Sequence, residues 1–210
     1  MLIEIYADIV CPWCYIGERR LSRALARREE AEAFDVEFRP FQLDPREPRG
    51  PRPLREALAR KFGGRAESIM RQVSEAARGE GITIDWDRAL AANTFDAHRL
   101  LWFALRDYDA AVQRALIERL FAAHFTEGGD VGDRGQLVDY AASVGIDRDR
   151  AAAFLASEEG APEIRGAMQE AHDLGVTAVP TFVLDQQYAI PGAQAPEVFA
   201  QALEQVAPTG

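Results

Sequence analysis

The segment CPWC, residues 11–14, constrains the fold of this chain most strongly, because it holds both cysteines of the 210 residues. It directly follows residues 2–8, a short apolar stretch with the character of a buried strand. Pro12 is suited to the first position of a helix. A disulfide spanning two residues closes too small a loop to restrain the unfolded chain much. The pair therefore indicates metal or redox chemistry rather than a structural crosslink.

A structural zinc site does not fit the rest of the sequence. Zinc usually takes four nitrogen or sulfur ligands, as two such cysteine pairs or as one pair with closely spaced histidines. This chain has one pair, and its histidines are scattered at His98, His124 and His172. We therefore expect no metal and predict a redox-active dithiol.

The position of the pair assigns different roles to the two sulfurs. The free N–H groups of the first helical turn and the helix dipole are expected to favour the anionic form of Cys11. Cys14 lies one turn further along and is expected to be more buried. Cys11 is therefore predicted to attack the substrate disulfide, and Cys14 to attack the mixed disulfide formed at Cys11. Pro12 would stiffen the turn, and Trp13 would form apolar surface beside the thiols. Asp8 is a candidate proton acceptor, or equally a residue that caps the end of the strand.

The order of elements predicts an α/β fold interrupted by a long helical segment. Residues 2–8, 12–31 and 34–43 read as strand, helix and strand, which favours parallel pairing through a right-handed crossover. Residues 44–53 contain four prolines and are predicted to be a loop. Helical patterns fill 54–174, and a hairpin (181–184, 188–190) precedes a final helix that Pro196 opens. The two ends would form a small mixed sheet with helices on both faces.

A second signal is Pro180, which stands immediately before the apolar segment 181–184. A proline there is unusual for a central strand. A cis Val179–Pro180 bond would explain it, because it exposes backbone groups of Val179 and Thr181 that can pair with an extended peptide lying across the cysteines. An ordinary trans proline is the alternative that base rates favour.

Charge and hydropathy exclude several classes of partner. The formal net charge of −10 argues against a nucleic-acid partner and against an anionic membrane surface. No apolar run approaches the ~20 residues of a membrane span. The first residues lack the features of a secretory signal, so we expect a cytoplasmic protein.

CPWC after the first strand and VPT before a late strand resemble the DsbA family of the thioredoxin superfamily, and its FrnE-like cytosolic branch in particular. EFRPFQLDP, ANTFDAHRL, HFTEGGDVGD and YAIPGAQAPEVF are also similar to that branch. The resemblance implies a thioredoxin-like domain (1–45 and 175–210) with a large inserted all-helical domain (46–174). It also implies thiol–disulfide oxidoreductase activity on protein or small-molecule disulfides, without a bound cofactor. Cys11, Cys14 and a cis Pro180 would form the site.

Other functions stay open at this point. Kappa-class glutathione transferases and hydroxychromene-carboxylate isomerases share the insertion and look similar around ANTFDAHRL, but they typically carry serine at the position of Cys11. A glutathione-dependent isomerase or transferase is therefore one alternative, with glutathione as substrate or reductant. Under any of these functions, Asn93 and His98 are candidates to line the cleft from the inserted domain, and the alternatives for them are a packed helix start and a satisfied core histidine. A non-catalytic chaperone-like module is another alternative, and a disulfide isomerase would call for a homodimer.

Overall fold

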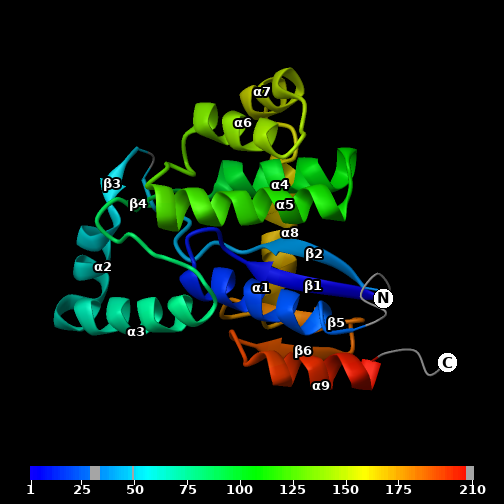
Figure 1. Cartoon of the computed structure of the whole chain (residues 1–210). Coiled ribbons are helices and arrows are strands. Elements are labelled where there is room, and N and C mark those ends of the chain that lie inside the picture. Colours follow the sequence, from blue (N-terminus) through cyan, green and yellow to red (C-terminus); the bar gives the residue numbers. More distant parts are fainter. Residues whose placement is uncertain (29–33, 49, 207–210) are drawn as a thin grey trace.

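The computed structural model describes residues 1–28, 34–48 and 50–206 and has a four-stranded mixed sheet at its centre (Figure 1). The strand order is β2 (Asp35–Pro40), β1 (Leu2–Ala7), β5 (Thr181–Leu184) and β6 (Tyr188–Pro191). β1 and β2 are parallel, whereas β5 is antiparallel to both β1 and β6. The predicted strand–helix–strand opening and the late hairpin are thus confirmed.

Helices cover both faces of this sheet. α1 (Pro12–Leu25) and α9 (Pro196–Val206) pack together on one face, and α8 (Ala161–Asp173) lies on the other, against β2 (Figure 1). α1 begins where Pro12 was predicted to open it. It ends before residue 31, the predicted end, and residues 29–33 lie outside the described part of the chain.

The long segment between β2 and β5 is mostly helical, as predicted. In chain order it contains α2 (Leu54–Phe62), the 3-10 turn η2 (Gly63–Arg65), α3 (Ala66–Gly79), α4 (Phe95–Asp107), α5 (Ala110–Ala122), the π-helical turn η3 (Ala123–Glu127), α6 (Arg134–Ser143), α7 (Arg148–Ala156) and α8. It is not entirely helical, which corrects the sequence-based description. The chain returns beside itself after α3, and β3 (Arg52–Pro53) pairs there with β4 (Leu90–Ala91). Next to this pair, the N–H of Leu54 donates to the Ala89 carbonyl at 2.9 Å.

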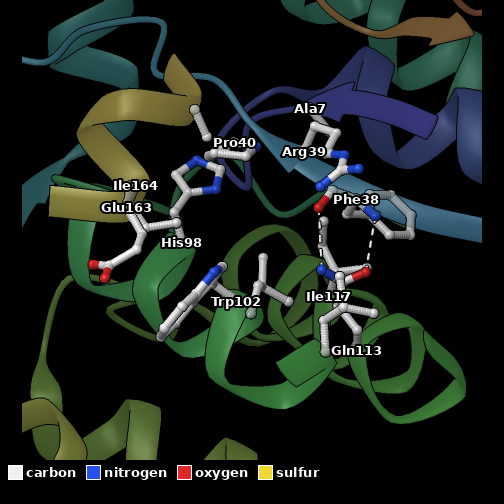
Figure 2. Close-up of a pocket in the computed structure, with 13 residues that line it drawn as sticks. Ala7, Phe38, Arg39, Pro40, His98, Trp102, Gln113, Ile117, Glu163 and Ile164 are labelled. Carbon is white, nitrogen blue, oxygen red and sulfur yellow. Dashed lines mark hydrogen bonds between the residues drawn. The ribbon is translucent and has the colours of Figure 1, made fainter. Parts of the chain in front are cut away.

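Polar side chains fasten the inserted helices to the sheet and to α1. The amide of Gln113, on α5, accepts from the Phe38 N–H at 2.8 Å and donates to the Phe38 carbonyl at 3.1 Å (Figure 2). Arg114 donates to the buried Glu18 carboxylate of α1 at 3.0 Å. Glu80, which directly follows α3, accepts hydrogen bonds from Arg20 and Arg23 of α1. These contacts fix the wall that the insertion places beside the cysteines.

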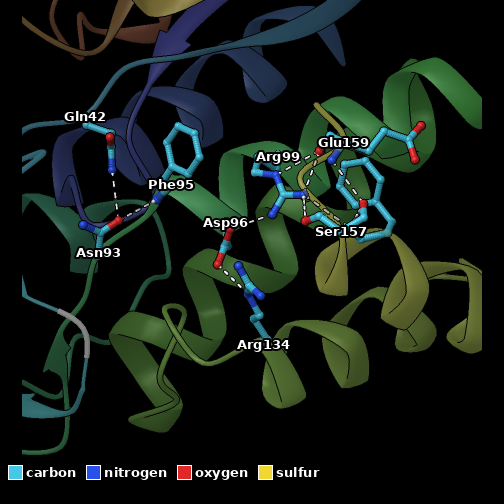
Figure 3. Close-up of polar contacts among 9 residues, drawn as sticks. Gln42, Asn93, Phe95, Asp96, Arg99, Arg134, Ser157 and Glu159 are labelled. Carbon is cyan, nitrogen blue, oxygen red and sulfur yellow. Dashed lines mark hydrogen bonds and ion pairs between the residues drawn. The ribbon is translucent and has the colours of Figure 1, made fainter. Parts of the chain in front are cut away.

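Within the insertion, a buried arginine holds three segments together. Arg99 of α4 is 1% exposed, and its guanidinium donates to Asp96 at 2.8 Å and to the carbonyls of Ser157 and Glu159 at 2.7 Å (Figure 3). Asp96 also accepts from Arg134 at 2.7 Å. A buried charge is tolerated when it is paired and hydrogen-bonded in this way. The charged residues of the ANTFDAHRL motif are therefore structural in this region.

Candidate active site

The two cysteines lie at the junction of β1 and α1, and both are free thiols. Cys11 is the N-cap residue of α1, and its carbonyl accepts the Cys14 N–H at 3.0 Å. The extended backbone of Cys11 (φ −94°, ψ 109°) starts the helix, and Pro12 follows without an N–H to satisfy. Cys11 is 4% exposed and Cys14 is fully buried. The sulfur nearer to solvent is thus the one predicted to attack.

One expected contact of Cys11 is not present. Its side chain accepts no capping hydrogen bond from the first turn of α1. Instead the thiol donates to the carbonyl of Val179 across a 3.6 Å distance. Pro12 removes one of the expected donors, and the side chain turns toward the loop before β5. In the reduced protein, Cys11 is therefore positioned by the segment that was predicted to receive the substrate.

The environment of Cys14 separates it chemically from Cys11. Burial raises the pKa of the Cys14 thiol well above its ordinary value, and the hydrogen bond and charge of Cys11 raise it further. The backbone N–H of Asp8 acts in the opposite direction but is outweighed. Cys14 is consequently a protonated thiol that must lose its proton before it can attack a disulfide.

The Val179–Pro180 peptide bond is cis, and it packs beside the cysteine helix. Gly17 of α1 makes this packing possible. A Cβ atom on Gly17 would lie 3.2 Å from Cγ of Pro180 and 3.0 Å from Cζ of Phe182. A larger residue would require the Phe182 and Pro180 side chains to move aside by a few tenths of an ångström. The glycine in CYIG is therefore part of the architecture of the site, which sequence reasoning had missed.

A wide cleft opens above Cys11, with a volume of about 690 Å³. Its floor is formed by residues of the cysteine turn and the proline loop, namely Asp8, Val10, Cys11, Pro12, Trp13 and Val179. Its walls come mainly from the insertion and are largely apolar: they include Leu54, Leu58, Phe62, Ile69, Val73, Trp86 and Phe125. Four basic side chains, Arg46, Arg52, Arg60 and Lys61, also line it, together with the acidic Asp44 and Glu47. Cys11 thus faces a largely apolar chamber with charged groups of both signs on its wall.

The model of the DSBA-like thioredoxin domain matches residues 2–204. The chain belongs to this family. The match spans the sheet, the cysteine turn and the helical segment between β2 and β5. The thioredoxin-like α/β fold inferred from the sequence is confirmed.

Individual relatives agree with this assignment. A probable DsbA oxidoreductase from Streptomyces coelicolor is 36% identical, with a TM-score of 0.88 over 98% of this chain and 89% of its own. The uncharacterized protein YwbO of Bacillus subtilis (strain 168) is 26% identical over 96% of this chain and 94% of its own. The cytosolic disulfide reductase DsbM of Pseudomonas aeruginosa, solved with GSH, is 19% identical over 98% of both chains, with a TM-score of 0.66, and shares the fold.

The residues predicted to contact substrate fall into two groups in this DSBA-like site. Pro12, Trp13 and Val179 line the cleft together with Cys11. Asn93, His98 and Thr181 are absent from its lining. The amide of Asn93 donates to the Glu47 carbonyl at 2.8 Å and accepts from the Phe95 N–H, so it shapes the start of α4. The hydroxyl of Thr181 donates to the Ala178 carbonyl at 2.8 Å. Substrate contact by these three residues stays a prediction.

His98 and Asp8 form a buried polar pair behind the cysteines. Nε2 of His98 lies 3.0 Å from the Phe41 carbonyl and 3.4 Å from Oδ1 of Asp8. The shorter contact takes the Nε2 proton, so the longer one is electrostatic rather than a second full hydrogen bond. Asp8 is 1% exposed, and its Oδ2 accepts the Leu43 N–H at 2.8 Å. The pair joins the end of β1 to helix α4 of the insertion.

Among the described residues, no helix combines the length and apolar composition that crossing a bilayer requires. In the same residues, no cluster of three or more His, Cys, Asp or Glu side chains has a geometry suited to a metal ion.

Proposed function

We propose that this protein is a dithiol–disulfide oxidoreductase that exchanges disulfides through Cys11 and Cys14. The observation that carries the proposal is the pairing of an outer thiol at the floor of the cleft with a fully buried one behind it, beside a cis proline. Such an arrangement lets one sulfur meet the substrate while the other waits for the mixed disulfide. The family supports this class of chemistry.

The reaction can be written with the residues in place. The Cys11 thiolate attacks one sulfur of a substrate disulfide, and the other substrate sulfur leaves as a thiolate with the electron pair. Cys14 then loses its proton and attacks the Cys11 sulfur of the mixed disulfide. The Cys11–Cys14 bond forms, and the second substrate sulfur leaves as a thiolate. The protein gives up two electrons, and the substrate gains two electrons and two protons.

The cleft supports small disulfides and single side chains of protein substrates as partners. Its volume of about 690 Å³ lies within the range of ~300–1,000 Å³ that is typical of small-molecule sites. The Val179 carbonyl, beside Cys11, is available to an extended backbone once the thiol releases it. A cytoplasmic location and a place in the FrnE-like branch belong to the same proposal, and they rest on the resemblance of the motifs.

Insulin reduction tests the proposal directly. The wild-type protein is expected to accelerate reduction of insulin by dithiothreitol, and Cys11→Ser is expected to have no such effect. Cys14→Ser is the matched variant, because it keeps the attacking sulfur and should accumulate a mixed disulfide that mass spectrometry detects. Equal activity of wild type and Cys11→Ser would refute the proposal. Equilibration against glutathione redox buffers would then give the potential of the pair and the favoured direction.

A glutathione-dependent transferase or isomerase is the second candidate, and the cleft favours it. A chamber this large with basic residues on its wall can hold an anionic tripeptide beside an apolar substrate. Calorimetric titration of glutathione into the Cys11→Ser/Cys14→Ser double variant separates the two candidates. Tight binding without either thiol, together with unchanged turnover of an electrophilic substrate, would favour the second.

A further inference from the structure

The disulfide exchange proposed above requires a proton to reach or leave Cys14, and the structure offers little room for that transfer. Cys14 is fully buried and does not line the cleft. Asp8 is the acidic residue that influences its sulfur, and the side of Asp8 that meets the cleft would be covered by a bound substrate. A proton must therefore cross the protein while the mixed disulfide fills the cleft.

A second hollow lies on the other side of Asp8. It is a cavity of about 100 Å³ between the sheet and helices α4, α5 and α8. At ~30 Å³ for each molecule, it has room for about three waters. Its lining includes His98, Arg39 and Trp102, and also Glu163, which is exposed. Figure 2 shows the His98 imidazole beneath Pro40 and beside the start of α8. The cavity thus reaches solvent at a point remote from the cleft.

His98 is the residue that joins the two hollows. Its Nε2 atom faces Oδ1 of Asp8 at 3.4 Å, while its ring borders the cavity. Oδ1 of Asp8 is buried and accepts no hydrogen bond from the described residues, although a buried carboxylate oxygen normally has a donor. Nδ1 of His98 is the ring nitrogen left free to exchange protons with cavity water. We propose that His98 relays protons between this cavity and Cys14 through Asp8, so that resolution proceeds while substrate blocks the cleft.

The relay rests on the proposed disulfide exchange and balances with it. When a substrate thiolate attacks the Cys11 sulfur of the oxidised protein, the Cys11–Cys14 bond breaks and Cys14 leaves with the electron pair. In one concerted transfer, water in the cavity protonates Nδ1 of His98, the Nε2 proton passes to the Asp8 carboxylate, and Asp8 hands the proton on to Cys14. A hydrogen bond from His98 to the Phe41 carbonyl requires a proton on Nε2. The same tautomer can donate the Nε2 proton toward Asp8. The reverse reaction uses the other tautomer and sends the proton outward.

The charged and titratable groups around Asp8 leave His98 as the connection to solvent. Cys14 interacts with Asp8 from α1, and the charge of Asp8 acts on His124 in η3. The charged residues that share the cleft with Asp8 lie on the side that a bound substrate covers: Asp44, Arg46, Glu47, Arg52, Arg60 and Lys61. His124 is fully buried and lines neither hollow, so it has no route to water. Arg39 of β2 is held by Glu4 at 2.6 Å and faces the cavity rather than the cleft. A general acid–base group contributes ~10²–10⁴-fold to a rate where it acts.

Substrate size provides the test. Oxidised wild type, His98→Gln and the control His124→Leu are each mixed with one of two thiols. The first, called the naphthyl thiol, is a cysteine peptide that carries naphthyl groups on both sides and is chosen to occupy most of the cleft of about 690 Å³. The second is 2-mercaptoethanol, which leaves room for water in the cleft. Reduction is followed by acid quench and alkylation from pH 5 to 9. We expect His98→Gln to be at least about tenfold slower than wild type with the naphthyl thiol, and about equal to it with 2-mercaptoethanol. His124→Leu is expected to match wild type with both thiols.

Two further variants keep the test decisive. Ala167→Leu retains His98 but fills part of the cavity, and it should reproduce the selective loss with the naphthyl thiol. His98→Gly should be rescued by added imidazole, which a purely structural role would not allow. Equal slowing of His98→Gln with both thiols and an unchanged pH profile would overturn the relay. If the wild-type protein reduces insulin and His98→Gln reacts with the naphthyl thiol as fast as wild type does, the relay is wrong. The proposed disulfide exchange would be unaffected by that result.

Discussion

The thioredoxin-like part and the inserted helices contribute different things to one site. The two cysteines and the cis proline lie next to the ends of β1 and β5, where the backbone is fixed by the sheet. Most of the cleft wall comes from the insertion, from Leu54 to Phe125. In the proposed disulfide exchange, chemistry and recognition would therefore be carried by separate stretches of the chain. Substitutions in the first should abolish turnover, whereas substitutions in the second should change binding or stability.

The largest effect is expected at Cys11. Replacing it by serine removes the nucleophile, so the rate of disulfide exchange should fall on the order of 10⁴-fold or more. The free energy of unfolding should hardly change, because serine is close in size. Turnover of insulin and chemical denaturation measure the two quantities. A variant that kept a tenth of the activity would show that the thioredoxin-like part does not carry the chemistry.

A large stability effect is expected at Arg99, within the insertion. Arg99→Met leaves the buried Asp96 and several carbonyls without this donor, which should cost about 3–5 kcal/mol of unfolding free energy. The control Arg148→Met removes an exposed pair with Asp139, and it should cost less than about 1 kcal/mol. Urea denaturation measures both. Similar losses in the two variants would contradict the structural role of Arg99.

A pH effect is expected where the two parts meet, at His124. Burial lowers the pKa of His124 from 6.5 to about 4, against a small opposing effect of Asp8. The unfolded chain then binds the proton more readily than the folded one, so stability is lost as the pH falls from 6.5 toward 4. At ~1.4 kcal/mol per pH unit, this interval corresponds to about 3 kcal/mol.

The contribution of His124 can be isolated by difference. Between pH 7 and pH 4, wild type should lose about 3 kcal/mol of unfolding free energy more than His124→Leu loses. Denaturation curves across this range measure it. A gap that stays constant with pH would show that His124 is solvated in the folded protein.

The smallest effect is expected on the cleft wall. Phe62→Ala removes apolar surface from the cleft wall that the insertion contributes, and it should raise KM about tenfold for an apolar disulfide, because ~1–2 kcal/mol of burial is lost. The kcat value should stay the same, since this interaction does not change in the transition state. Leu174→Ala, which alters an exposed residue outside the cleft, is the control. A fall in kcat for Phe62→Ala would mean that the insertion takes part in the chemistry.

The thioredoxin-like part could be predicted from sequence because its signals are local. CPWC sits between a strand and a helix that begins at its proline, and Pro180 precedes a strand that pairs with β1. Both patterns can be read within about ten residues. Pro12, Trp13 and Val179 follow from the same short segments, and all three line the cleft.

The rest of the site could not be predicted, because packing assembles it from distant helices. Trp86 follows α3 and Phe125 lies in η3, and they line the same cleft because the Asp85 N–H bonds to the Phe125 carbonyl at 2.7 Å. Gly17 shows no local sign that a proline 163 positions away would approach it. The sequence left two positions open for His98, the cleft or the core, and only the packed structure shows it buried behind Asp8. Helical periodicity identifies a buried face without identifying what that face contacts.

The hydrogen bonds of Gln113 have a consequence beyond docking. β2 is an outer strand, and an outer strand with open backbone groups can recruit a strand from another molecule. The Gln113 amide occupies both the N–H and the carbonyl of Phe38, as a neighbouring peptide bond would. The insertion therefore prevents another strand from pairing with β2 at Phe38. Gln113→Leu should make the protein more prone to aggregate.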